Sequence, residues 1–307
     1  MKKRLLILWF TLAICTATGW GAPINIQADI QYKTTPAGAL LLDLHYPEKE
    51  LSGNYPLVIY THGGGWAAGS KANASSGKKG MAVRALTEEG FCVAAVSYRL
   101  CKKGSNVAMR DCVIDAKDAI RYLSKHHEAL FLDMDRLFVF GDSAGGQIAQ
   151  MLLLSAPESL PGAEELAGVD YTVRAGVSWY GPCDFEKTAL FNHDDRPNFR
   201  DRFGGRILKP DTRPKDKLRL FREMSPVNYL HKESPPLLMI QGDKDTTIPV
   251  KHAHYMKKKA DAIGAPVEIL IVKNAGHNWR TVDAAIEPSV EVIVQRTVDF
   301  MVAHLPE

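Results

Sequence analysis

The chain has 307 residues, of which 46% are hydrophobic and 24% charged, so it resembles an ordinary globular protein that can bury a large core. Its formal net charge is only +3, and no long basic run stands out, which argues against nucleic acid as a partner. Length alone allows one or two domains, and we expect a single catalytic domain over residues 22–307.

The first residues have the features of a signal peptide. Lys2, Lys3 and Arg4 precede the apolar run Leu5–Cys15, which is followed by small residues. This run is too short for a comfortable membrane span. We therefore expect residues 1–21 to be removed and the mature protein to be secreted or periplasmic, with no stable membrane insertion after cleavage.

Four cysteines remain once the signal peptide is removed: Cys92, Cys101, Cys112 and Cys183. Export would permit disulfides. Cys101 and Cys112 flank a short polar loop and could pair, but the residues leave this open. The spacing of the cysteines matches no zinc signature, so no metal is expected.

Eight segments are predicted as strands. Most are continuous apolar runs, which suit strands that are covered on both faces of a parallel sheet. The first two alternate more between polar and apolar residues and are expected to form an antiparallel edge. The predicted strands are 24–32, 40–46, 58–60, 91–96, 137–140, 175–179, 237–240 and 267–272.

Helical segments alternate with these strands. Their apolar residues fall on one face at a 3.6-residue period, in 112–123, 147–154, 250–262 and 290–302. This alternation predicts an α/β fold with a mostly parallel, doubly wound sheet of about eight strands. The long segment 185–223 is rich in Arg, Asp, Lys and Pro, and we expect it to be an insertion that caps the sheet edge where ligands bind.

A candidate nucleophile lies in the sequence GDSAGG at 141–146. A predicted strand runs directly into this G-x-S-x-G motif and a predicted helix follows it, which is the context the motif requires. The turn is tight, and glycines beside Ser143 avoid clashes there. Ser143 is therefore the predicted nucleophile.

A serine hydroxyl requires an adjacent base, and the base requires an acid to orient it. His277 follows the predicted strand 267–272, at the end of the sheet where catalytic loops gather. Two carboxylates, Asp243 and Asp245, follow the strand 237–240. We favour Asp245, which lies farther along the turn, as the acid, and expect Asp243 to be structural.

A glycine run can supply the oxyanion hole. The sequence HGGGW at 62–66 follows the strand 58–60. We expect the backbone N–H groups of Gly63, Gly64 and Ala144 to bind the oxyanion, and His62 to orient the loop. The aromatic side chains expected to line the substrate pocket are those of Trp66, Trp179 and Tyr180.

With HGGGW, GDSAGG, QGDKDTTIP at 241–249 and AGHNW at 275–279, the chain resembles the hormone-sensitive-lipase-like branch of the α/β hydrolases, and in particular the BD-FAE-like exported bacterial esterases. The order Ser143, Asp245, His277 is typical of that fold. The resemblance covers essentially the whole mature chain and implies carboxylic ester hydrolysis without a metal or an organic cofactor. The chain departs from the group at Gln241, where His is common, and at Cys101.

The resemblance implies a small-molecule or oligosaccharide ester as substrate, with short acyl or aryl groups such as acetyl or feruloyl groups on a polysaccharide. Two alternatives remain open at this stage. One is a serine exopeptidase on the same fold, and the other is a non-catalytic binding protein on a hydrolase scaffold. The oligomeric state is left open.

Overall fold

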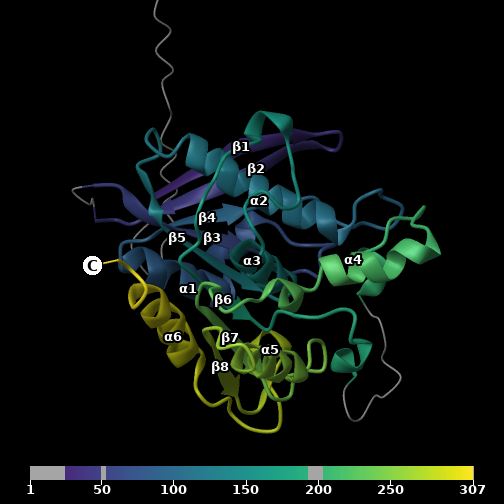
Figure 1. Cartoon of the computed structure of the whole chain (residues 1–307). Helices are drawn as coiled ribbons and strands as arrows, with labels where there is room; N and C mark the ends of the chain where they lie inside the picture. The colour runs from purple at the N-terminus through teal and green to yellow at the C-terminus, as the bar shows by residue number, and fades with distance from the viewer. Residues whose placement is uncertain (1–24, 50–52, 193–202, 307) are drawn as a thin grey trace, which may run out of the picture.

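The computed structural model describes residues 25–49, 53–192 and 203–306 (Figure 1). The predicted signal peptide, residues 1–21, lies outside the described residues. Its removal and the export of the protein therefore stay predictions.

The described chain is organised around one eight-stranded sheet, as predicted. Its strand order is β1-β2-β4-β3-β5-β6-β7-β8. The pairs β1–β2 and β2–β4 are antiparallel and all the others are parallel, which confirms the antiparallel edge. The strands are β1 (Asn25–Thr35), β2 (Gly38–Tyr46), β3 (Tyr55–Thr61), β4 (Cys92–Val96), β5 (Leu132–Asp142), β6 (Ala175–Trp179), β7 (Leu237–Gly242) and β8 (Val267–Val272).

The central strands are buried on both faces because helices cover both. Along β3, Leu57 and Ile59 enter one hydrophobic cluster, whereas Val58 and Tyr60 enter the other. This two-residue alternation is the ordinary geometry of a strand. It explains why the central strands have continuous apolar sequences rather than alternating ones.

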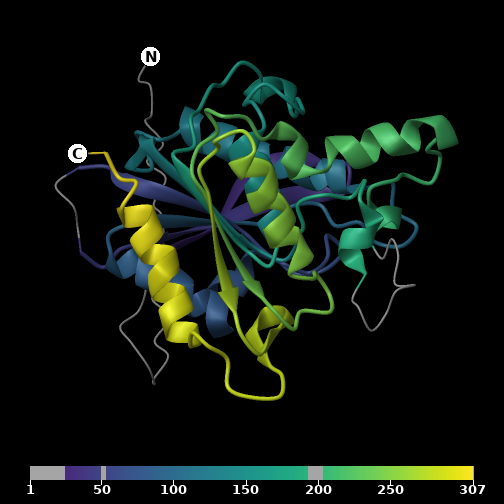
Figure 2. The same cartoon turned by 60° about the horizontal axis from the view of Figure 1, so that its bottom comes forward.

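Five helices cover the sheet. On one face lie α2 (Met109–Lys125), α3 (Ala144–Leu154) and α5 (Lys251–Asp261). On the other lie α1 (Gly77–Glu88) and α6 (Val290–Val302), which pack against each other. Figure 2 shows α5 and α6 on opposite sides of the C-terminal strands. Four of these helices were predicted.

Helix α1 was not identified from apolar periodicity, and its sequence explains why. Gly77 and Gly80 lie in its first turn, where they disfavour a helix, and Lys78 and Lys79 separate them. Packing against α6 and the sheet compensates for this weak local preference. The chain thus forms a helix there for tertiary reasons.

The predicted insertion contains the short helix α4 (Lys217–Glu223) and several turns of 3-10 helix, and α4 lies at the right of Figure 1. Within its described residues, Phe191, Phe203 and Phe221 are buried in the same cluster as α3. The described part of the insertion is therefore packed onto the domain by aromatic side chains.

The four described cysteines are free thiols. The sulfur atoms of Cys101 and Cys112, whose pairing the sequence leaves open, lie 3.7 Å apart without a disulfide bond. No helix in the described ranges is both long enough and apolar enough to cross a bilayer.

His252 on α5 is a buried histidine outside any cavity described below. The backbone N–H of Cys183 donates to its Nδ1 at 3.2 Å, and the ring of Phe191 packs against it with centroids 4.4 Å apart. Burial lowers the pKa of His252 from 6.5 to about 3. The imidazole is therefore neutral in the folded protein above about pH 3.

This burial predicts a loss of stability in acid. Between pH 6.5 and about pH 3, the unfolded chain binds a proton at His252 that the folded chain does not. The free energy of unfolding then falls by about 1.4 kcal/mol per pH unit as the pH drops through this window. His252→Gln keeps an acceptor for Cys183 but does not titrate. The dependence of its free energy of unfolding on pH should therefore be weaker by the contribution of one proton, about 1.4 kcal/mol per pH unit.

Urea unfolding at several pH values from about 4 to about 7 measures this slope. His254→Gln, an exposed position on the same helix, is the matched control and should keep the slope of the unmodified protein. An unchanged slope in His252→Gln would contradict the prediction.

Candidate active site

Ser143 lies in a strained turn between β5 and α3. Its backbone has φ 54° and ψ −117°, a conformation that non-glycine residues rarely adopt. The turn requires glycine on both sides, because a Cβ at Gly141 would lie 2.1 Å from the carbonyl oxygen of Gly145, and a Cβ at Gly145 would lie 1.9 Å from that of Thr61. The strain holds Ser143 at the positive end of α3.

Three side chains from separate loops form one hydrogen-bonded chain, as the sequence analysis expected. The Ser143 Oγ lies 2.9 Å from His277 Nε2, and His277 Nδ1 lies 2.7 Å from Asp245 Oδ2. Because a carboxylate only accepts, Nδ1 carries the proton and Nε2 is free to accept one from the hydroxyl. This is the arrangement that activates a serine for attack.

Asp245 is buried and held by several donors. Its Oδ1 accepts from the backbone N–H groups of Thr247 and Ile248, at 2.8 and 2.9 Å. Gln241, the residue that departs from the resembling group, donates to Oδ2 at 3.1 Å and to the Ile248 carbonyl at 2.7 Å. These bonds fix the carboxylate that faces His277. Asp243 makes no contact with His277, in agreement with the choice of Asp245.

The loops that carry Asp245 and His277 come together because a glycine ends β7. A Cβ at Gly242 would lie 2.1 Å from the carbonyl oxygen of Ala275. The backbone N–H of Lys244 donates to that same carbonyl at 3.0 Å. The acid and the base are thus held by direct contact between their loops.

Ser143 and His277 open into a cavity of about 500 Å³. Its other lining residues are mostly glycines and polar side chains: Gly63, Gly64, Gly65, Gly69, Asn73, Lys79, Asp142, Phe203, Arg206, Thr247 and Asn278. Within the described residues, no group of three or more His, Cys, Asp or Glu side chains is arranged to hold a metal ion.

The three aromatic residues predicted to line this cavity do not do so. Trp66, Trp179 and Tyr180 are each exposed by 1% or less. The indole N–H of Trp66 donates to Gln147, and that of Trp179 donates to Thr297. The prediction is wrong because these rings complete the core beneath the site.

Tyr180 nevertheless contacts the site, because its side chain packs against His277 from the core. Its ring packs edge-on against His277 with centroids 4.8 Å apart, and against Trp279 at 4.6 Å. The contact fixes the plane of the imidazole, and it is made without exposing Tyr180 to the cavity. The role of Tyr180 is therefore one of support rather than of substrate contact.

The predicted oxyanion hole requires one correction. The backbone N–H of Gly63 already donates to Asp142 Oδ1 at 2.9 Å, so it is not available to a substrate oxygen. The N–H groups of Gly64, Gly65 and Ala144 donate to no acceptor within the described part of the chain. Gly64 and Gly65 also line the cavity with Ser143. Gly65 therefore replaces Gly63 among the candidate donors.

His62 orients the glycine loop, as expected. Its Nδ1 donates to the Gly63 carbonyl at 2.8 Å, and its ring stacks on Tyr98 with centroids 4.2 Å apart. Burial lowers the pKa of His62 below its ordinary value. A buried neutral imidazole is suited to holding a loop, and it is not among the residues that line the cavity.

Asp142 is the most important residue that the sequence analysis did not single out. Its Oδ1 accepts from Tyr60 Oη at 2.8 Å as well as from Gly63. Lys79 Nζ lies 3.6 Å from its Oδ2. One buried carboxylate beside the nucleophile therefore anchors the glycine loop. Its position next to Ser143 within GDSAGG was the only signal available.

The chain is similar to a known protein family and to several known proteins. The model of the BD-FAE family matches residues 42–260. Esterase LipC of Mycobacterium tuberculosis is 29% identical over 232 residues, which are 75% of this chain and 54% of LipC. The chain spans about half the length of the first curated relatives it matches.

Solved structures of similar fold include esterase 2 of Thermogutta terrifontis and a truncated carbohydrate esterase from gut microbiota. The first has a TM-score of 0.72 at 20% identity, covering 92% of this chain and 97% of its own. The second has a TM-score of 0.72 at 21% identity, covering 91% and 95%. These similarities establish that the chain has the α/β-hydrolase fold.

The contacts of Asp142 generate a testable prediction. Asp142→Ala removes the acceptor of two buried donors, the Gly63 N–H and the Tyr60 hydroxyl. Each unpaired donor costs about 1–3 kcal/mol, so the free energy of unfolding should fall by about 2–6 kcal/mol. Urea unfolding measures this, and amide hydrogen exchange at Gly63 should become faster.

Asp142→Asn is the matched control, because its side-chain oxygen still accepts both hydrogen bonds. It should lose much less stability than Asp142→Ala and keep Gly63 protected from exchange. Equal losses in the two variants would show that Asp142 does not anchor the loop through these bonds.

Proposed function

The chain belongs to the BD-FAE family, and on this premise we propose that it is a serine hydrolase that cleaves carboxylic esters. The observation that carries the proposal is the continuous hydrogen-bonded chain from Ser143 through His277 to Asp245, beside an open cavity. Relatives whose names describe esterases support the same reaction class. The three residues act as nucleophile, base and acid.

In the first half of the reaction, Ser143 Oγ attacks the ester carbonyl carbon while its proton moves to His277 Nε2. Asp245 stabilises the imidazolium through the hydrogen bond to Nδ1. The carbonyl oxygen becomes an oxyanion, which the N–H groups of Gly64, Gly65 and Ala144 bind. Losing one such donor typically costs about 3–4 kcal/mol of barrier.

In the second half, the tetrahedral intermediate collapses and His277 gives its proton to the leaving alcohol oxygen, leaving the acyl group on Ser143. Water then attacks the acyl-enzyme while His277 accepts one of its protons. Collapse of the second intermediate returns a proton to Ser143 and releases the carboxylic acid. No metal or redox step is needed to balance this reaction.

The substrate we propose is an ester of a short acyl or aryl group, such as an acetyl or feruloyl group on an oligosaccharide. The polar lining of the cavity, with Lys79, Asn73 and Thr247, favours a polar alcohol over a lipid chain. The N-terminal sequence favours export to the periplasm or the medium, where such polymers occur. The intact mass of the exported protein would reveal whether residues 1–21 are removed.

Replacing the nucleophile tests the reaction directly. Ser143→Ala should reduce turnover of p-nitrophenyl acetate by about 10⁴-fold or more, because no other group can form the acyl-enzyme. The midpoint of thermal unfolding should not fall. Ser124→Ala, whose hydroxyl has only one distant contact at 3.4 Å, is the matched control and should remain active.

A fluorophosphonate probe should add its mass to the peptide that contains Ser143 and to no peptide of Ser143→Ala. If the unmodified protein hydrolyses neither esters nor aminoacyl p-nitroanilides and resists the probe, the proposal is refuted. If it hydrolyses only the anilides, it is a serine exopeptidase on the same fold.

The polar cavity also predicts how activity varies with the acyl group. In an apolar acyl groove each CH₂ adds about 0.8 kcal/mol of binding, or about fourfold in kcat/KM. We expect no such rise between p-nitrophenyl acetate and p-nitrophenyl hexanoate. A steady fourfold gain per CH₂ would instead indicate a lipase-like substrate.

A further inference from the structure

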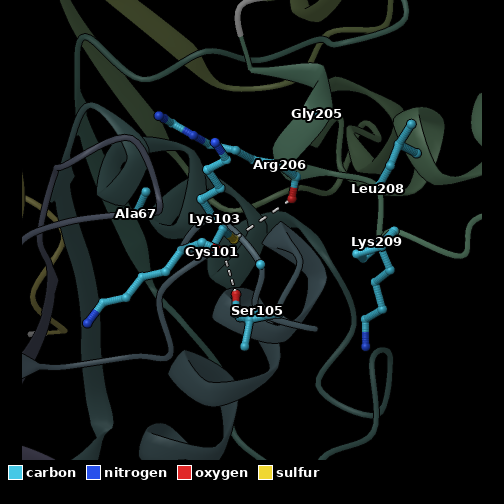
Figure 3. Close-up of a pocket in the computed structure, with 12 residues that line it drawn as sticks. Ala67, Cys101, Lys103, Ser105, Gly205, Arg206, Leu208 and Lys209 are labelled. Atoms are coloured by element: carbon cyan, nitrogen blue, oxygen red, sulfur yellow. Dashed lines mark hydrogen bonds between the residues drawn. The ribbon is translucent and has the colours of Figure 1, made fainter.

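A second cavity of about 630 Å³ adjoins the first (Figure 3). It lies between the loop 101–107 and the segment 205–210 of the insertion, and we call it the basic pocket. Arg206 lines both this pocket and the cavity of Ser143, so the two are neighbours. Its lining residues are Ala67, Cys101, Lys102, Lys103, Gly104, Ser105, Val107, Gly205, Arg206, Leu208, Lys209 and Pro210.

The basic pocket has an excess of positive charge. Its lining among the described residues includes Lys102, Lys103, Arg206 and Lys209, and no Asp or Glu. Lys209 approaches Asp111 at 3.3 Å, whereas Lys102 and Lys103 form no ion pair among the described residues. The whole chain has a net charge of only +3, so this is a local concentration of charge.

Arg206 is held in place by neutral groups. Its guanidinium donates to the carbonyl oxygen of Gly65 and lies over the ring of Phe203, 5.5 Å from the centroid. No carboxylate pairs with it in the part of the chain that is described. A half-buried guanidinium without a counter-charge is positioned to bind an anion, and its planar fork suits a carboxylate.

Arg206 also connects this charge to the reaction centre. Gly65, whose carbonyl it binds, is a candidate donor to the oxyanion through its own N–H. A group bound at Arg206 therefore lies beside the reacting ester. If the acyl group on Ser143 is short, as proposed above, the part of the ester that reaches the basic pocket is the alcohol part.

We propose that the basic pocket binds a carboxylate on the alcohol part of the ester, so that the preferred substrate is an acylated glycan containing uronic acids. This inference rests on the ester hydrolysis proposed above and specifies its substrate class. Lys102 and Lys103 supply exposed charge that attracts the polymer, and Arg206 supplies the directed contact. Because the lysines are exposed, salt should weaken their contribution.

The test compares kcat/KM for O-acetylated trigalacturonate with that for O-acetylated xylotriose, which has no carboxylate. For the unmodified protein, the ratio of the two should exceed one and fall as NaCl rises from about 20 mM to about 500 mM. In the double variant Lys102→Gln, Lys103→Gln the ratio should fall by about five- to tenfold.

The matched control is the double variant Lys258→Gln, Lys259→Gln on α5, which removes two exposed charges that line neither cavity. Its ratio should equal that of the unmodified protein. An equal fall in both double variants would show that only the overall charge matters, and would overturn the proposal.

Two further outcomes separate this inference from the proposed function. If the protein hydrolyses p-nitrophenyl acetate but shows no preference for the acidic substrate at either salt concentration, the inference fails and the ester hydrolysis stands. If no ester is hydrolysed, calorimetric titration with trigalacturonate still tests whether the basic pocket binds a carboxylate. Binding that the double variant Lys102→Gln, Lys103→Gln weakens supports the inference, and the absence of binding refutes it.

Discussion

The close contact between the end of β3 and the first turn of α3 is the constraint on which the rest of the site depends. The backbone at Gly145 approaches the carbonyl of Thr61 so closely that no side chain larger than hydrogen fits between them. This contact turns Ser143 into its strained conformation and brings Asp142 against Gly63. Ser143 and the glycine loop are therefore positioned by one packing arrangement, and a strained turn of this kind persists only because the surrounding structure fixes it.

Two buried carboxylates of the site are each held by more than one partner. Asp142 accepts from Gly63 and Tyr60, and Asp245 accepts from two backbone N–H groups as well as from Gln241 and His277. Multiple donors leave each of these carboxylates one orientation. Preorganisation of this type limits the movement needed when charge develops in the reaction. The departure at Gln241 fits this scheme, because an amide donates to Asp245 without adding a charge.

The sequence was sufficient to predict the sheet and the three residues of the hydrogen-bonded chain, Ser143, His277 and Asp245. Each of them lies in the loop after an apolar strand, and parallel strands end at the same edge of a sheet. It was not sufficient to predict which hydrogen-bond acceptor each backbone N–H contacts, or which aromatic side chains face the cavity. In HGGGW, all three glycines are equivalent by type, and only the contact with Asp142 removes Gly63 from the candidate donors. Trp66 ends the HGGGW motif, and Trp179 and Tyr180 lie at the end of β6, yet all three side chains are buried in the core, where size and apolar character place aromatic residues most often.

The division between sheet and insertion explains how chemistry and substrate choice can be separated in this fold. The hydrogen-bonded chain of Ser143, His277 and Asp245 is built from loops at the strand ends. Small changes in the geometry of these loops would displace Ser143 or Asp245. Arg206 and Lys209 instead come from the insertion, and Lys102 and Lys103 from a loop that is not part of this hydrogen-bonded chain. Charges at these positions can change without disturbing the contact between β3 and α3. Arg206 links the two regions through its bond to the carbonyl of Gly65, so we expect a ligand bound at Arg206 to act on the loop that carries the candidate oxyanion donors.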